Sequence, residues 1–99
     1  MRALDTLTWH VMDAMADDWE SVEWIRPHVH EYVGPVSDEE ILAILRRLHS
    51  EKLVEIMKVP SQLDNVLETQ PMACWFGMTE AGRSLWDSEG AKYRDESQV

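Results

Sequence analysis

The sequence has little cysteine and no long apolar stretch, and each scarcity excludes a class of protein. The 99 residues include one cysteine, Cys74, so no disulfide can form within the chain. No apolar run approaches the roughly 18 residues needed to cross a bilayer. The first residues also lack the basic and apolar regions of a signal peptide. We therefore expect a cytoplasmic protein with no membrane partner.

Basic residues are scarce as well. Nine Lys and Arg stand against nineteen Asp and Glu, which gives a formal net charge of −10. A field of that sign repels a phosphate backbone at long range. Five acids follow one another with no basic residue between them: Asp13, Asp17, Asp18, Glu20 and Glu23. This stretch is interpreted as a solvated helix end and loop, or alternatively as a docking face for a basic partner.

The motifs of enzymes are missing from the sequence. There is no glycine-rich phosphate loop. A catalytic arrangement of Ser, His and Asp needs a cleft to bring the residues together, and the sequence does not predict one. Cys74 stands beside Trp75 and Phe76 with no adjoining basic residue to activate it, which favours a small buried side chain over a nucleophile. The sequence predicts no enzymatic activity and no cofactor.

Metal-binding patterns are equally weak. His28 and His30 are two residues apart and point to different sides of a helix. His10, Asp13 and Asp17 share a face, but they have no Cys partners and no obvious fourth ligand. Ordinary surface polarity is the favoured interpretation, so no metal site is predicted.

The apolar pattern at the start of the chain predicts helices. The chain is 44% apolar and has five Trp and six Met, enough for the modest core of one domain. Apolar residues recur at intervals of three and four over residues 3–15, which indicates an amphipathic helix. Residues 19–21 form a short extended candidate, and Ser21 can cap a second helix. Pro27 predicts that this helix is kinked or begins at the proline itself.

A third helix is predicted over residues 38–52. Ser37 can accept an amide hydrogen bond at the third helical position while Glu40 reaches back to the cap. The buried stripe is Ile41, Ile44, Leu45 and Leu48, and the exposed side carries Glu39, Ala43, Arg46, Arg47 and Ser50.

The second half of the chain predicts a hairpin and a last helix. Residues 53–59 and 72–78 alternate well enough for two strands, with a loop between them. Thr79 can cap a helix that fades after residue 90. Residues 91–99 are polar and are predicted to form a flexible tail.

Two segments carry a family resemblance. Residues 45–56 (LRRLHSEKLVEI) resemble the end of the recognition helix and the first wing strand of bacterial PadR- and MarR-type transcriptional regulators. Residues 75–83 (WFGMTEAGR) are similar to the junction between their second wing strand and last helix. The resemblance implies a winged helix-turn-helix domain over residues 1–90, mainly α with a small antiparallel β-hairpin. It has a three-helix core, a β-wing and a C-terminal helix.

The resemblance also implies a DNA-binding surface and a homodimer. Ser37, Arg46, Arg47 and Lys58 are the candidate DNA contacts. Lys52 stands where such regulators commonly have Gly, which suits a left-handed helix end, so Lys there would cost about 1 kcal/mol or end the helix differently. The helix that would read bases begins with three acids at positions 38–40, which a phosphate wall repels.

Two tryptophans are candidates for an interface. Strand alternation places Trp75 opposite Phe76 and Met78, so it is predicted to face solvent or a second chain, and Trp86 is grouped with it. Two functions therefore stay open: a DNA-binding transcriptional regulator, or an acidic winged-helix module that binds a basic protein and does not contact DNA directly.

Overall fold

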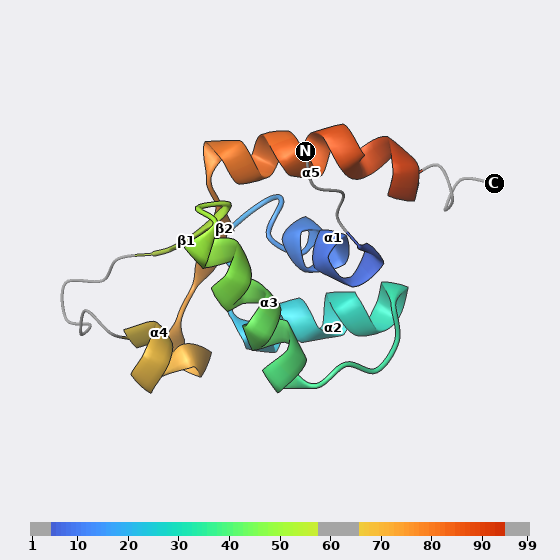
Figure 1. Ribbon diagram of the computed structural model, residues 1–99. Helices are drawn as coiled ribbons and strands as arrows, with labels where there is room; N and C mark the ends of the chain where they lie inside the picture. The colour runs from blue at the N-terminus through green and yellow to red at the C-terminus, as the bar shows by residue number, and fades with distance from the viewer. Residues whose placement is uncertain (1–4, 58–65, 95–99) are drawn as a thin grey trace.

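The computed structural model describes residues 5–57 and 66–94 and is mainly helical, with one two-stranded antiparallel sheet (Figure 1). In chain order the elements are α1 (Thr6–Asp13), α2 (Val22–Tyr32), α3 (Asp38–Ser50), β1 (Val54–Ile56), α4 (Val66–Thr69), the 3-10 turn η1 (Pro71–Ala73), β2 (Phe76–Met78) and α5 (Glu80–Arg94). Helix α5 lies along one side of the three-helix group, and α4 lies at the far end from the C-terminus. The predicted winged-helix arrangement is confirmed.

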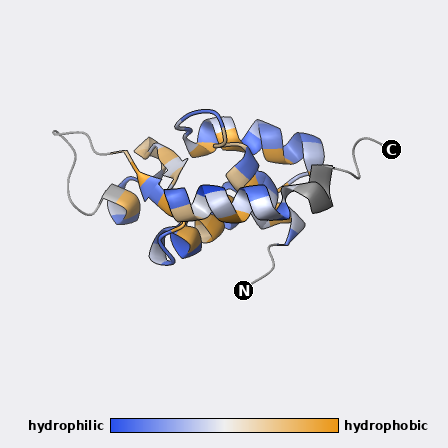
Figure 2. Ribbon diagram, turned by 90° about the horizontal axis from the view of Figure 1, so that it is seen from above, coloured by the Kyte–Doolittle hydropathy of each residue, from blue (hydrophilic) through white to orange (hydrophobic). Residues whose placement is uncertain are grey.

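The core lies where α1, α2 and α3 meet. Met12 from α1, Ile25 from α2 and Leu45 from α3 are fully buried, and the stripe predicted for α3 is buried as expected. Each such side chain contributes roughly 1.5–3 kcal/mol when it leaves water. The helices alternate apolar and polar along their length, and the outer side of α5 is mainly hydrophilic (Figure 2).

The sheet is short and has a third partner. Strand β1 pairs with β2 in the register Val54↔Met78 and Ile56↔Phe76. On the edge of β2 that faces away from β1, Phe76 exchanges two backbone hydrogen bonds with Glu20, at 2.9 and 2.8 Å. The short extended segment predicted at 19–21 is therefore confirmed, and it attaches the chain before α2 to the sheet.

The predicted start of α2 after Ser21 is confirmed: the helix begins at Val22 and runs through Pro27, so the alternative start at the proline is wrong. Several other predicted boundaries are wrong. The second strand begins at Phe76, because residues 71–73 form a 3-10 turn with Pro71 in its first position. The loop before it contains α4. Helix α5 continues beyond residue 90 to Arg94.

Helix α5 is positioned on the rest of the molecule by its first turn. Thr79 accepts a hydrogen bond from the Gly82 amide at 3.0 Å, and its hydroxyl donates to the Lys52 carbonyl at 2.7 Å. A Cβ atom at Gly82 would lie 1.9 Å from the carbonyl oxygen of Leu53. Glycine is required there because the helix backbone touches the chain that leads into β1.

Candidate nucleic-acid interface

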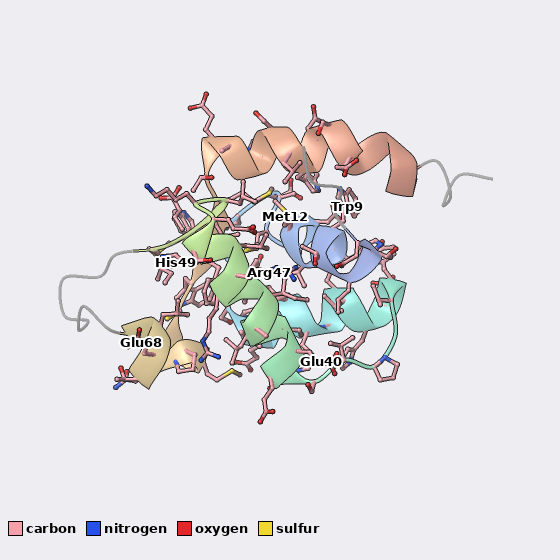
Figure 3. The ribbon with its side chains drawn as sticks, viewed as in Figure 1. Trp9, Met12, Glu40, Arg47, His49 and Glu68 are labelled. Carbon is pink, nitrogen blue, oxygen red and sulfur yellow. The ribbon has the colours of Figure 1, made fainter. Side chains whose placement is uncertain are left out.

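The exposed side of α3 carries two of the residues that the sequence predicted as DNA contacts, Arg46 and Arg47. Its outward stripe is Glu39, Ala43, Arg46 and Ser50, which recur at helical spacing while the other side of the helix is buried. Glu40 lies at the start of the helix and His49 at its end (Figure 3). The stripe is therefore acidic at its N-terminal end and basic in its second half.

The first turn of α3 is held by its cap and by an ion pair. The Ser37 hydroxyl accepts a hydrogen bond from the Glu40 amide at 3.2 Å and lies 3.3 Å from the Glu40 carboxylate. Asp38 accepts two hydrogen bonds from the Arg26 guanidinium of α2, at 2.5 and 2.8 Å. The pair neutralises Asp38, but Glu39 stays exposed at the end of the helix that would enter a groove.

The two arginines of α3 differ in their surroundings. A guanidinium nitrogen of Arg47 donates to the hydroxyl of Thr8, a buried residue of α1, at 2.9 Å. Figure 3 shows Arg47 on the side of α3 nearest α1. Arg46 is exposed, and within residues 5–57 and 66–94 the structure gives it no hydrogen bond or ion pair. A phosphate could bind Arg46 without disturbing a contact within the described residues, whereas the bond to Thr8 already orients the Arg47 guanidinium toward α1.

Lys58 lies outside the described residues, as does the segment 58–65 that would form the tip of the wing. Lys52, which comes two residues after α3 ends, is described and exposed. Lys52 has a positive φ of 63°. It therefore adds one further positive charge at the C-terminal end of α3.

The two candidate interface tryptophans occupy different environments. Trp75 has 39% of its surface exposed, in agreement with the predicted outward direction. Trp86 packs between helices: its ring stacks on that of Trp9 with centroids 6.2 Å apart, and its Nε1 donates to Asp13 at 3.0 Å. Trp86 is thus part of the contact between α1 and α5.

A second polar group, made of His10, Asp13 and His28, lies between α1 and α2. The Nε2 of His28 is 3.1 Å from Oδ2 of Asp13. Burial lowers the pKa of His10. Burial would raise the pKa of the Asp13 carboxyl, but the contacts with His28 and Trp86 outweigh it and hold that pKa below its usual value. Asp17, which the sequence grouped with His10 and Asp13, is exposed and is not in the group.

The thiol of Cys74 is buried, and burial raises its pKa. It lies 3.7 Å from the carbonyl oxygen of Gln70. A raised pKa leaves the group as a weakly reactive thiol. Cys74 has the environment of a packing residue, as the sequence predicted.

No protein-family model matches the sequence, and no curated protein matches it significantly. Among solved structures, a MarR family transcriptional regulator from Silicibacter pomeroyi superposes with a TM-score of 0.69 at 14% identity, over 96% of this chain and 58% of that one. A PadR-like transcription factor from Bacteroides fragilis gives 0.68 at 17% identity, over 93% and 84% of the two chains.

A mutant of ZitR from Lactococcus lactis gives a TM-score of 0.66 at 13% identity, over 96% of this chain and 56% of that one. The present chain therefore spans little more than half the length of two of these three proteins. The likeness shows that the fold is that of winged-helix regulators. None of the helices within the described residues is long and apolar enough to cross a membrane.

Proposed function

We propose that this chain is a winged-helix transcriptional regulator that binds duplex DNA through α3. The observation that carries the proposal is the outward stripe of α3, which presents Arg46 on a fold similar to that of MarR- and PadR-type regulators. A recognition helix of this kind lies in the major groove, where its side chains reach base edges and the adjacent phosphates.

The charge of the surface determines how such binding would behave. With a net charge of −10, and with Arg26 already paired with Asp38, few cations are available to phosphates. The number of phosphate contacts sets the salt dependence of the binding constant. We therefore expect weak binding to random DNA, with a shallow dependence on salt.

A salt titration of random duplex DNA tests the proposal. Binding should be measurable near 50 mM salt, and Arg46→Ala should make the slope of log K against log salt shallower by about 0.9, because one phosphate contact is lost. Arg83→Ala on α5 is the matched control, since Arg83 binds the Ala16 carbonyl and lies outside the proposed interface. Failure of the wild-type chain to bind near 50 mM salt, or an equal effect of both variants, would refute DNA binding through α3.

A second candidate function is binding to a basic protein. It is favoured by Glu39 and Glu40, which remain exposed at the end of α3 that would approach DNA. The double change Glu39→Gln with Glu40→Gln separates the two functions. It removes repulsion and strengthens DNA binding if α3 faces phosphates, whereas it weakens capture of a basic partner, measured by pull-down and mass spectrometry, if α3 is the docking face.

We also propose that the chain forms a homodimer with Trp75 in its interface. Aromatic side chains that stay partly exposed in a monomer are common at interface centres. The exposed fraction of Trp75 supports this role, while the packing of Trp86 against Trp9 and Asp13 argues for a role within each chain.

A further inference from the structure

The group of His10, Asp13 and His28 has the composition and spacing of a metal site. Each residue offers one ligand atom, and these atoms all lie within 4.8 Å of one another. His10 and Asp13 are three residues apart on α1 and therefore share a face, while His28 comes from α2. The group therefore has ligand atoms from two helices, α1 and α2, which are separate in the sequence.

The distances suit a small divalent cation. Ligands bound to zinc at about 2.0–2.1 Å in a tetrahedron are roughly 3.4 Å apart. Oδ2 of Asp13 and Nε2 of His28 are already 3.1 Å apart. Nε2 of His28 is buried and, despite that distance, does not make a hydrogen bond of good geometry. An ion bound between these two atoms would give Nε2 of His28 the partner that it lacks, with the ligand atom of His10 within 4.8 Å of both.

Neighbouring side chains orient the ligands. Nε1 of Trp86 donates to Oδ1 of Asp13 at 3.0 Å, which leaves Oδ2 directed at His28. The ring of Tyr32 stacks on His10 with centroids 5.2 Å apart and an interplanar angle of 5°. Such contacts fix the ligand rotamers before an ion arrives, and in metalloproteins they contribute strongly to affinity.

We propose that His10, Asp13 and His28 bind a first-row divalent transition metal, with Zn²⁺ as the expected ion. Two imidazoles and one carboxylate select such ions over Mg²⁺ and Ca²⁺, which prefer all-oxygen sites. Water completes the coordination. The bound ion ties α1 to α2 and, through Trp86, to α5. This site is independent of whether α3 binds DNA.

The test is titration of the metal-free full chain with Zn²⁺ by calorimetry, together with thermal unfolding. We expect one equivalent of Zn²⁺ to bind and Tm to rise by several degrees, because the ion binds the folded chain preferentially. His10→Gln, Asp13→Asn and His28→Gln should each weaken binding at least tenfold. Trp86→Phe should weaken it about tenfold by releasing Oδ1 of Asp13.

The other two histidines provide matched controls. His30, whose Nε2 lies 2.9 Å from the Val36 carbonyl oxygen, and His49 on α3 are exposed and outside the group. His30→Gln and His49→Gln should bind Zn²⁺ like wild type, and Mg²⁺ should not compete. Circular dichroism of each metal-free variant separates loss of a ligand from loss of the fold.

Three results would overturn the proposal. The first is no binding to the wild-type chain at about 100 µM Zn²⁺, a concentration that detects even weak sites. The second is an equal loss of affinity in the His30 or His49 variant. The third is unchanged affinity in folded His28→Gln and Asp13→Asn chains.

Discussion

Lys52 stands where the regulators that this sequence resembles commonly have Gly, and its backbone still adopts the left-handed conformation that Gly favours. Its φ of 63° is the left-handed conformation that usually selects glycine. The amide of Lys52 donates to the His49 carbonyl at 3.1 Å and that of Leu53 donates to the Leu48 carbonyl at 2.9 Å. These are the two bonds of the turn that commonly ends a helix at a left-handed residue. The sequence alone identified the position, and the structure shows that lysine adopts the strained conformation rather than ending α3 differently.

We predict that Lys52→Gly stabilises the protein by about 1 kcal/mol, because glycine adopts a positive φ without the steric cost of a Cβ atom. Urea unfolding monitored by circular dichroism measures the change. The matched control is Ser50→Gly, two residues earlier in helical conformation, which should destabilise by about 0.5 kcal/mol. A loss of stability in both variants would show that the lysine side chain contributes more than its backbone strain costs.

Single residues with long-range partners were the hardest to assign from sequence. Arg47 lies on the side of α3 that periodicity places outside, yet its guanidinium reaches Thr8, 39 residues away along the chain. His28 joins His10 and Asp13 because α2 packs on α1. Periodicity gives the face of one helix, but it does not say which face of another helix lies opposite. The sequence grouped His10 and Asp13 with Asp17, and what it could not supply was that His28 takes the third place.

At the scale of elements, the long amphipathic helices followed from the sequence and the short elements did not. The apolar residues of α1 and α3 recur every three or four positions, which predicts a helix, because a half-buried strand would have them at every second position. Residues 72–75 have no apolar periodicity that would distinguish a strand from a turn. Pro71 suits the first position of a 3-10 turn, and residues 71–73 form that turn. Helix α2 contains Pro27 because the packing of Ile25 and Val29 outweighs one missing hydrogen bond.

The docking of α5 gives a prediction at the same scale. Gly82→Ala places a Cβ atom 1.9 Å from the Leu53 carbonyl oxygen, so α5 must shift away from the chain that leads into β1. We expect destabilisation of about 3 kcal/mol or more, since backbone on both sides leaves little room to adjust. Thermal unfolding measures it. Ala81→Gly, one residue earlier and exposed, should cost only about 1 kcal/mol. Similar losses in the two variants would mean that helix propensity, and not the close approach, sets the need for glycine.

At the scale of the whole molecule, the fold is similar to that of MarR and PadR-like transcriptional regulators, whereas a net charge of −10 repels a phosphate backbone. The sequence contained both facts, because the segments at 45–56 and 75–83 carry the fold and the acids carry the charge. Sequence could not show how the nine basic residues are used. In the folded chain Arg26, Arg47 and Arg83 all make internal hydrogen bonds. Of these three, only Arg26 is paired with a carboxylate, that of Asp38, so the charge of Arg26 alone is neutralised within the described residues.

The two tryptophans give predictions about different properties of the whole molecule: Trp75 about assembly, and Trp86 about the packing of α5 on α1. Trp75 is partly exposed, so Trp75→Ala should cost less unfolding free energy than Trp86→Ala but should lower the mass measured by light scattering, if a dimer forms around it as we propose. Trp86 stacks on Trp9 and binds Asp13, so Trp86→Ala should cost roughly 2–3 kcal/mol of unfolding free energy. A wild-type mass that Trp75→Ala does not change would exclude Trp75 from any interface. A Trp86→Ala chain as stable as wild type would contradict the packing of α5 on α1.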